Sequence, residues 1–309
     1  MIQIDPKRSL FRRQTARFNP YRLVVLLGLV IAGLYLLLGF ERGEVKELFL
    51  PTGTPTRVAN SFALEAEAQF TAGNLQKAIE AYQKAVELDP QNARLMADLA
   101  RTQVYYSSLS TTLADSQQRL QGAKTTIDRA TELAPDDPRV QAIRALVYDW
   151  YANPDISGDE AAYNLTQAEQ AAIRALQLDS QNALALAFYA EILVDQQKWL
   201  QAEQNIELAL ERDDSLMDVH RVSGYVQESL SNYEGAIAEY QKAAAIAPNF
   251  TPLYISIGTN YRTLGLRSTN ELRMKEMYNK ALEFYAKAVV INKQIGVNDP
   301  IPYLSIAKT

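Results

Sequence analysis

The sequence predicts an all-α protein, in which about six helical hairpins stack into a solenoid behind a single transmembrane helix. Three observations support this prediction. A long apolar run without charges lies near the N-terminus. The chain after Arg57 is rich in alanine, with Pro and Gly at spaced positions, which favours helices over strands. A residue pattern then recurs at a period of about 34 residues, which is typical of stacked helical hairpins.

Composition indicates a folded chain and excludes several kinds of chemistry. Of the 309 residues, 48% are hydrophobic and 22% are charged, which is ordinary for a globular protein. The chain has no cysteine, so disulfides, thiolate metal sites and cysteine nucleophiles are excluded. The absence of cysteine leaves the redox compartment open.

Charge is distributed unevenly along the chain. Residues 1–22 carry a net charge of +5, so the overall charge of −5 leaves −10 on the remainder. Binding of nucleic-acid phosphates needs clustered positive charge, which an acidic body does not offer. We therefore expect no nucleic-acid partner.

The apolar run, Leu23–Phe40, is 18 residues long and contains no charge. A helix rises about 1.5 Å per residue, so this run nearly matches a hydrocarbon core of roughly 30 Å. The alternative is a cleaved signal peptide, which has an apolar region of about 7 to 15 residues and a small-residue cleavage site. Residues 39–43 offer no such site, and we expect an uncleaved anchor.

Basic residues before the apolar run predict its orientation, because positive charge is retained on the cytoplasmic side. Residues 41–47, just after the run, sum to −1. We expect residues 1–22 to be a basic cytoplasmic segment and residues 23–40 to cross the cell membrane once. A linker of residues 41–58 then leads to an extracytoplasmic body. The six basic residues of the first segment are Lys7, Arg8, Arg12, Arg13, Arg17 and Arg22.

Pairs of alanines seven residues apart recur six times, and this spacing places both on one face of a helix. The pairs are Ala78 with Ala85, Ala123 with Ala130, Ala168 with Ala175, Ala202 with Ala209, Ala236 with Ala243, and Ala281 with Ala288. A small residue precedes each pair, by 12 residues at Ala66, Ala190 and Gly224, and by 23 at Ala100, Ala145 and Gly258. The difference is 11 residues each time. We therefore expect an 11-residue insertion in three hairpins, each with a lengthened first helix.

Two copies of the pattern also contain its aromatic and proline positions. Gly73-Asn74-Leu75 leads through Ala78, Tyr82 and Ala85 to Pro90, and Asn232-Tyr233 leads through Ala236, Tyr240 and Ala243 to Pro248. The pattern resembles the tetratricopeptide repeat (TPR) family. This resemblance implies a right-handed α-solenoid of about six TPR hairpins over residues 59–295, with the insertions in repeats two, three and six. Residues 296–309 resemble the start of a seventh repeat or a C-terminal cap, and we expect the front part of a longer protein.

The inventory of reactive residues argues against an enzyme. The chain has one histidine and no cysteine, and it contains neither a nucleophile elbow nor a phosphate-binding glycine loop. His220 falls near the start of a first helix, where the family has a packing residue, so we expect a structural role for it. We predict no catalytic residue, no cofactor and no metal.

The resemblance also implies that the first helices line a concave groove, which receives peptides or helices of partner proteins. It places six candidate binding residues on this surface, together with Glu191 and Glu228: Arg94, Arg101, Arg139, Arg221, Tyr225 and Arg262. Arginine binds carboxylates with two parallel hydrogen bonds, so we expect the groove to accept an acidic group or a C-terminal carboxylate. Solvated surface charge is the alternative. Tyr105, Tyr106, Trp150 and Tyr151 either form an exposed tip for interaction or pack the extended hairpins together.

These observations predict a membrane-anchored TPR protein that binds other proteins as a scaffold, assembly or accessory factor. Two other roles stay open. In one, the repeats are the regulatory or recognition part of a longer enzyme; in the other, the protein is a fixed structural subunit of a membrane complex. The sequence identifies neither the partner nor the biological process, and it leaves the oligomeric state unknown.

Overall fold

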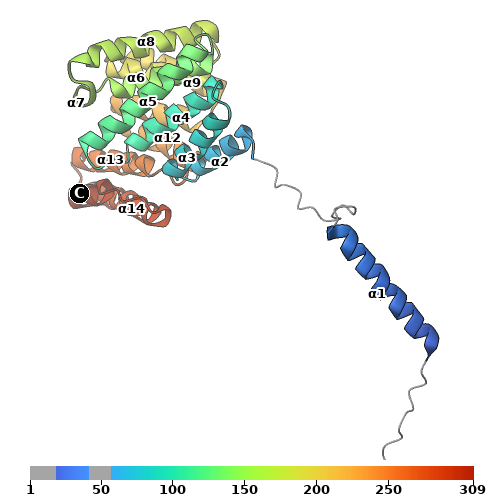
Figure 1. The fold of residues 1–309 in the computed structure, drawn as a ribbon. Helices are drawn as coiled ribbons and strands as arrows, with labels where there is room; N and C mark the ends of the chain where they lie inside the picture. The colour runs from blue at the N-terminus through green and yellow to red at the C-terminus, as the bar shows by residue number, and fades with distance from the viewer. Residues whose placement is uncertain (1–18, 42–56) are drawn as a thin grey trace, which may run out of the picture. The chain divides into compact units, whose positions relative to one another are not determined.

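The computed structural model describes residues 19–41 and 57–309. The chain divides into two units, residues 1–56 and residues 57–309, which are described separately. Most of the predicted basic segment and most of the predicted linker lie outside the described residues. The described part of the first unit consists of one helix, and the second unit holds the repeats (Figure 1).

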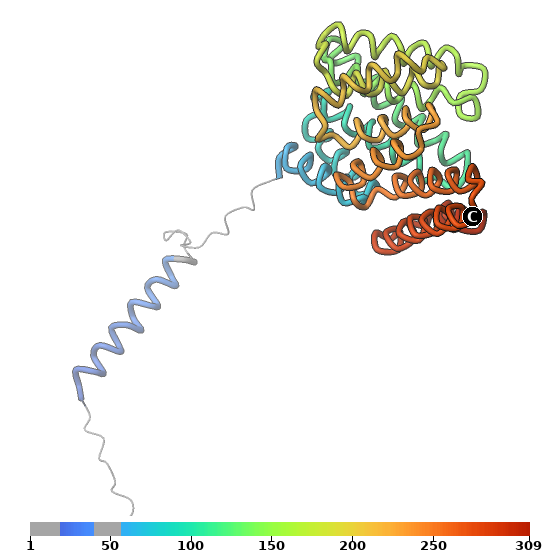
Figure 2. The backbone as a smooth tube through the Cα atoms, turned by 180° about the vertical axis from the view of Figure 1, so that it is seen from behind, coloured from blue at the N-terminus to red at the C-terminus, as the bar shows by residue number. Residues whose placement is uncertain are grey.

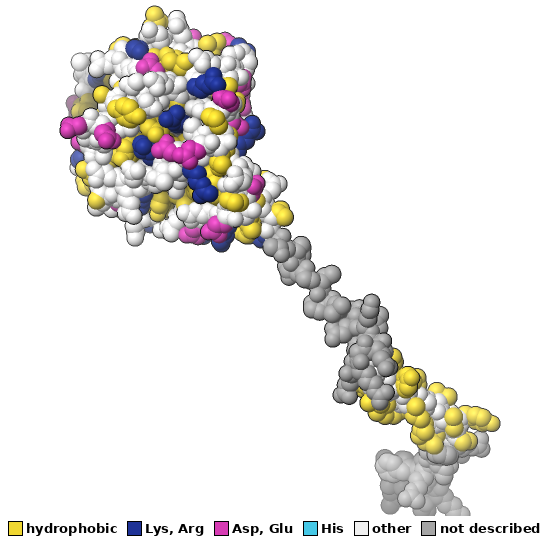
Figure 3. Space-filling model, turned by 45° about the horizontal axis from the view of Figure 1, so that its top comes forward, with side chains coloured by type: hydrophobic (Ala, Val, Ile, Leu, Met, Phe, Trp, Pro, Cys, Tyr) yellow, Lys and Arg dark blue, Asp and Glu magenta, His cyan; other side chains and the backbone are white. Residues whose placement is uncertain are grey.

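Helix α1 (Pro20–Glu41) is 22 residues long, which corresponds to about 33 Å. Its large apolar side chains are exposed all around the helix, from 46% at Leu38 to 81% at Tyr21. The visible face of α1 in Figure 3 is accordingly covered by hydrophobic side chains. Among the described residues, α1 is the one helix long and apolar enough to cross a membrane, although signal sequences share this length and composition.

The second unit consists of helical hairpins in chain order (Figure 1). Six pairs of helices form the hairpins: α2 (Ala59–Thr71) with α3 (Leu75–Leu88), α4 (Ala93–Ser107) with α5 (Leu113–Leu133), α6 (Pro138–Tyr151) with α8 (Ala161–Leu178), α9 (Ala183–Asp195) with α10 (Trp199–Arg212), α11 (Met217–Ser229) with α12 (Tyr233–Ile246), and α13 (Thr251–Arg267) with α14 (Glu271–Ile295). The short helix α7 (Pro154–Ser157) and a 3-10 turn (Gly158–Glu160) connect α6 to α8. Helix α15 (Ile301–Ala307) packs on α13 and α14.

The alanine pattern marks the contact between the two helices of each hairpin. All twelve alanines of the six pairs are 0% exposed. At the small positions on the facing helices, even a methyl group is too large in two repeats. A Cβ at Gly224 would lie 2.7 Å from the Tyr240 ring, and one at Gly258 would lie 2.5 Å from the Tyr285 ring. Small residues therefore allow the helices of a hairpin to approach each other closely.

The insertions fall mainly in the second helices and in the connection before them, whereas the sequence analysis expected them in the first helices. Second helices α5, α8 and α14 have 21, 18 and 25 residues, against 14 in α3, α10 and α12. The first helices of these three hairpins, α4, α6 and α13, have 15, 14 and 17 residues, against 13 in the other three. In the second repeat the turn at Ser108–Thr112 ends α4 before most of the inserted residues, and in the third repeat α7 and the 3-10 turn hold many of them.

The array curves so tightly that repeats far apart in the sequence meet. The side-chain amide of Asn249, in the turn after α12, donates a hydrogen bond of 3.2 Å to the carbonyl oxygen of Ala72, in the turn after α2. Gly73 has a φ of +74°, and a Cβ there would lie 2.4 Å from the carbonyl oxygen of Asn249. Glycine is therefore needed at this closing contact, both for its backbone conformation and for space. Figures 1 and 2 show α2 and α3 lying near α13 from opposite sides of the molecule.

Candidate functional site

A buried ion pair occupies the concave side of the array. Arg101 on α4 donates to both carboxylate oxygens of Asp218 on α11, at 3.0 and 2.5 Å, although the two residues belong to the second and fifth repeats. The Tyr105 hydroxyl donates to the same carboxylate. Asp218 is 1% exposed and Arg101 is 8% exposed. The first helices therefore contact one another across the concave side instead of lining an open groove.

Burial alone would raise the pKa of Asp218, but the Arg101 guanidinium and the Tyr105 hydroxyl outweigh it and lower that pKa. Arg101 is desolvated as well, yet the charge of Asp218 raises the pKa of its guanidinium. The Phe70 ring lies 4.5 Å from the guanidinium carbon of Arg101. Both members of the pair therefore stay charged inside the array.

A second buried ion pair lies beside the first. Arg221 on α11 donates to both carboxylate oxygens of Glu191 on α9, at 2.8 and 2.5 Å. The indole nitrogen of Trp150 on α6 donates to the same carboxylate at 3.2 Å. Arg221 and Glu191 are 9% and 6% exposed. Both oxygens of Glu191 are thus occupied by groups of the array itself.

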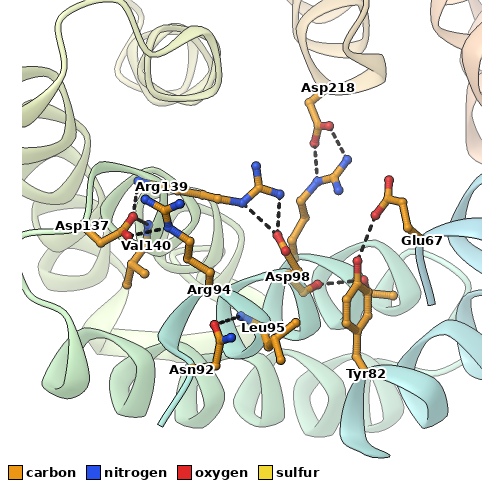
Figure 4. Close-up of polar contacts among 12 residues, drawn as sticks. Glu67, Tyr82, Asn92, Arg94, Leu95, Asp98, Asp137, Arg139, Val140 and Asp218 are labelled. Atoms are coloured by element: carbon orange, nitrogen blue, oxygen red, sulfur yellow. Dashed lines mark hydrogen bonds and ion pairs between the residues drawn. The ribbon is translucent and has the colours of Figure 1, made fainter. Parts of the chain in front are cut away.

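The structure brings only part of the predicted binding set to the surface. Arg101 and Arg221 lie inside the array with carboxylate partners, so the expectation of an open row of arginines does not fit their positions. Arg94 and Arg139 are more exposed and pair across neighbouring repeats, with Asp137 at 2.6 Å and with Asp98 at 2.6 Å (Figure 4). Tyr225 donates to Asp195 at 2.8 Å, and Arg262 on α13 is partly buried.

The four aromatic residues of the expected tip divide in the same way. Tyr105 is fully buried, with ring centroids 5.9 Å from Trp150 and 5.5 Å from Phe250. Trp150, Tyr106 and Tyr151 are partly buried and pack against the core. Packing between repeats is therefore the correct alternative for Tyr105.

His220 has the structural role expected for it. Its side chain is buried on α11, with Nε2 2.8 Å from the carbonyl oxygen of Asp214 and Nδ1 2.7 Å from Glu239. The histidine thereby joins the turn before α11 to helix α12 within one hairpin.

A cavity of about 770 Å³ lies where several first helices end. Three carboxylates from two neighbouring first helices line it: Asp149 on α6, and Glu191 and Asp195 on α9. Trp150 and Tyr225 contribute aromatic side chains to the lining, and residues of α7 and α8 line the cavity as well. Asp149 is 5% exposed and its Oδ1 atom is buried without a hydrogen-bond partner. Neither Asp149 nor Asp195 is among the residues predicted from the sequence.

Burial raises the pKa of Asp149 well above its usual range, and the charges of Asp195 and Glu191 raise it further. Burial also raises the pKa of Asp195, with the Tyr225 hydrogen bond acting against it. The cavity therefore holds two carboxyl groups whose ionised forms the array does not stabilise with a cation of its own.

The sequence contains a feature from which this wall of the cavity could have been predicted, namely a shared position in consecutive repeats. Tyr105, Trp150 and Asp195 each lie five residues after the small residue of a consecutive repeat, which is Ala100, Ala145 or Ala190. One register position in neighbouring hairpins lies on one side of a solenoid. Comparison of this position across repeats would have placed Trp150 and Asp195 together.

Two family models match the chain. One described as "TPR repeat" matches residues 67–104, and one described as "Tetratricopeptide repeat" matches residues 190–249. A search of curated proteins gives no significant match. Stacked hairpins with a buried alanine register define the chain as an α-solenoid. More particularly, the two matched segments are tetratricopeptide repeats, which supports a TPR family protein.

Solved structures with a similar arrangement include TPR proteins. Human IFIT1, solved as a dimer with m7Gppp-AAAA, is 17% identical with a TM-score of 0.53, and the match covers 82% of this chain and 64% of IFIT1. TTC0263, a TPR protein of Thermus thermophilus, is 15% identical with a TM-score of 0.49, covering 66% of this chain and 98% of TTC0263. YrrB, described as a TPR protein with an unusual peptide-binding site, is 19% identical with a TM-score of 0.40, covering 75% of this chain and 100% of YrrB. At these identities the IFIT1 match indicates a shared fold alone.

The raised pKa of Asp149 makes a prediction about stability and pH. The ionised carboxylate destabilises the folded state above the folded pKa, and this cost is relieved as the pH falls towards the unfolded value of about 3.9. Asp149→Asn removes the charge, so the variant should melt at a higher temperature than the original chain at neutral pH. The difference should shrink as the pH approaches about 4.

Thermal unfolding followed by circular dichroism between these two pH values measures the effect. Asp159→Asn, at an exposed position of the connecting turn, is the matched control and should leave the melting temperature nearly unchanged. Equal melting temperatures for Asp149→Asn and the original chain at neutral pH would contradict the raised pKa of an unpaired Asp149.

Proposed function

We propose that this protein is a membrane-anchored TPR scaffold, which holds partner proteins as an assembly or accessory factor. The observation that carries the proposal is the cavity on the repeat array, because a buried carboxylate without a partner lines it. A binding site characteristically combines an apolar wall with a few convergent polar groups, and this cavity has both. Partners of TPR proteins are generally other proteins, which supports the same class of ligand here.

The membrane part of the proposal rests on α1. This helix exposes leucine, valine and isoleucine side chains all around its axis. Exposure of this apolar surface to water costs free energy, and burial in lipid removes that cost, at roughly 25 cal/mol per Å² of apolar surface. The basic residues before α1 favour a cytoplasmic N-terminus, with the repeats on the other side of the cell membrane.

A role in binding is also favoured over catalysis. The one histidine of the chain is held by Asp214 and Glu239, and there is no cysteine to act as a nucleophile. Binding of a phosphate-rich ligand such as the m7Gppp-AAAA of the IFIT1 structure is disfavoured by the net charge of −10 after residue 22. Of the six binding residues predicted from the sequence, Arg94, Arg139 and Arg262 are the arginines that stay candidates for partner contacts, and Tyr225 lines the cavity.

Affinity capture of the full chain from detergent-solubilised membranes tests the scaffold role. We expect defined protein partners to stay bound through a moderate salt wash. Arg94→Gln with Arg139→Gln should weaken this capture, because both arginines lie at the surface between neighbouring repeats. The control pair Arg174→Gln with Arg212→Gln makes the same charge change on second helices and should retain the partners. Failure to retain any protein would contradict the scaffold, and unchanged capture by the first pair would exclude those two arginines.

The membrane topology can be tested with single cysteines, because the chain has none of its own. Gln204→Cys is exposed on α10, and Ser9→Cys precedes the apolar helix. The cells are treated so that a membrane-impermeant maleimide reaches the outer face of an intact cell membrane. The reagent should then label Gln204→Cys, but should label Ser9→Cys only after detergent has dissolved the cell membrane. The reverse pattern would contradict the orientation. A mature chain whose mass lacks the first 40 or so residues would show a cleaved signal peptide instead.

A further inference from the structure

The cavity described above lies at the carboxyl ends of three first helices. Helices α4, α6 and α9 end at Ser107, Tyr151 and Asp195, and residues at or within two positions of each of these ends line the cavity. The carboxyl end of a helix carries a partial negative charge and carbonyl groups without helical partners. The backbone therefore adds to the negative potential of the carboxylates.

The carboxylates of the cavity differ in what already occupies them. Glu191 is bound by Arg221 and by Trp150. Asp195 accepts one hydrogen bond, from the neutral Tyr225 hydroxyl. The carboxylate of Asp149 takes part in no hydrogen bond or ion pair in the described parts of the chain, although the residue is 95% buried. Asp149 and Asp195 thus lack a cationic partner.

Burial of an unpaired carboxylate is costly, and proteins normally pair such a group or hydrogen-bond it. The charged groups around Asp149 are Asp195, Glu191 and Arg221, and the one cation among them is committed to Glu191. A further cation from outside the array would restore the balance of charge.

The array contains an internal example of the recognition that such a cation would need. The guanidinium carbon of Arg221 lies 5.7 Å from the centre of the Trp150 ring while its nitrogens bind Glu191. Guanidinium is suited to this environment, because it binds carboxylates through a planar fork and stacks on aromatic rings. Trp150 and Tyr225 line the cavity together with Asp149 and Asp195. The cavity therefore has aromatic rings and carboxylates as well, but no arginine lines it.

A metal ion fits the cavity less well. Among the described residues, no three histidine, aspartate or glutamate side chains converge closely enough to hold a metal ion. The volume of about 770 Å³ also exceeds the need of an ion and has room for a side chain with its neighbouring backbone.

We propose that this cavity receives the guanidinium group of an arginine side chain from a protein partner, bound by Asp149 and Asp195 between Trp150 and Tyr225. This deepens the proposed function and rests on it for the identity of the partner as a protein. The charge of the ligand is opposite to the one expected from the sequence, because the arginines of the concave side are paired within the array.

Tryptophan fluorescence provides a direct test. The chain has two tryptophans, and Trp199 is 41% exposed at the start of α10, so Trp199→Phe leaves Trp150 as the only reporter. The full chain with this change is titrated in detergent with acetyl-Gly-Arg-Gly-amide. The matched peptide contains citrulline in place of arginine, which keeps the shape and removes the charge. We expect a saturable change in Trp150 emission with the arginine peptide and at least tenfold weaker binding of the citrulline peptide.

Variants of the cavity complete the test. Asp149→Asn with Asp195→Asn should weaken binding of the arginine peptide by about tenfold or more, because both charge-assisted partners are lost. Glu207→Gln with Glu211→Gln makes the same charge change on the exposed face of α10 and should leave binding unchanged. Equal titrations with the arginine and citrulline peptides would overturn the proposal, as would full binding by the Asp149 and Asp195 double variant with an intact melting transition.

The same variants separate this proposal from the scaffold role. Protein partners that are captured equally by the original chain and by the Asp149 and Asp195 double variant would overturn the arginine site while leaving the scaffold intact. Binding of the arginine peptide without capture of any protein would support the cavity as a guanidinium site and contradict the scaffold. Loss of both capture and peptide binding in the double variant supports the two proposals together.

Discussion

The buried pair of Arg101 and Asp218 is the contact on which the arrangement of the array depends. It joins the second repeat to the fifth, whereas neighbouring hairpins in a solenoid contact only each other through their stacked faces. A pair of this kind contributes little net stability, because two charges must leave water, but removal of one partner leaves an uncompensated buried charge. The pair therefore specifies one curvature more than it strengthens the fold.

Closure of the concave side decides which charges remain for a ligand. Arg101 and Arg221 would line an open groove in a flatter array, but here each forms an ion pair with a carboxylate from another repeat. Near the ends of α6 and α9, Asp149 and Asp195 then have no cationic partner among the described residues. The sign of the remaining binding site follows from this internal pairing. Net charge along the sequence does not reveal it.

Local features of the fold could be predicted from the sequence, because they depend on spacing within one hairpin. The alanine pairs predicted the hairpin contacts, and every one of these alanines is buried. The apolar run predicted a helix of membrane-spanning length at α1. The division of the insertions among first helix, connection and second helix was missed, since an 11-residue difference between two marked positions does not say which segment grows. The turn residues at Ser108–Thr112 were the signal that α4 ends before most of the inserted residues.

The candidate site was less predictable, for a physical reason. Curvature accumulates from small rotations between neighbouring repeats, so the contact of Arg101 with a residue 117 positions away leaves no mark in the spacing of any single hairpin. Resemblance to the family placed the arginines on the concave side but did not show that this side closes. The wall of the cavity could have been predicted in part from the sequence, since Tyr105, Trp150 and Asp195 share one position in the repeat.

A double-mutant cycle on Arg101 and Asp218 tests the central claim most directly. Arg101→Leu, Asp218→Leu and the combination are compared with the original chain in urea unfolding, with Arg174→Ala and Asp136→Ala as an exposed control pair. Each buried single change should cost about 3–5 kcal/mol and the double change clearly less than their sum, with a coupling of about 1 kcal/mol or more. The control pair should couple by less than about 1 kcal/mol. Additive effects at Arg101 and Asp218 would mean that the second and fifth repeats do not meet, and would contradict the closed array.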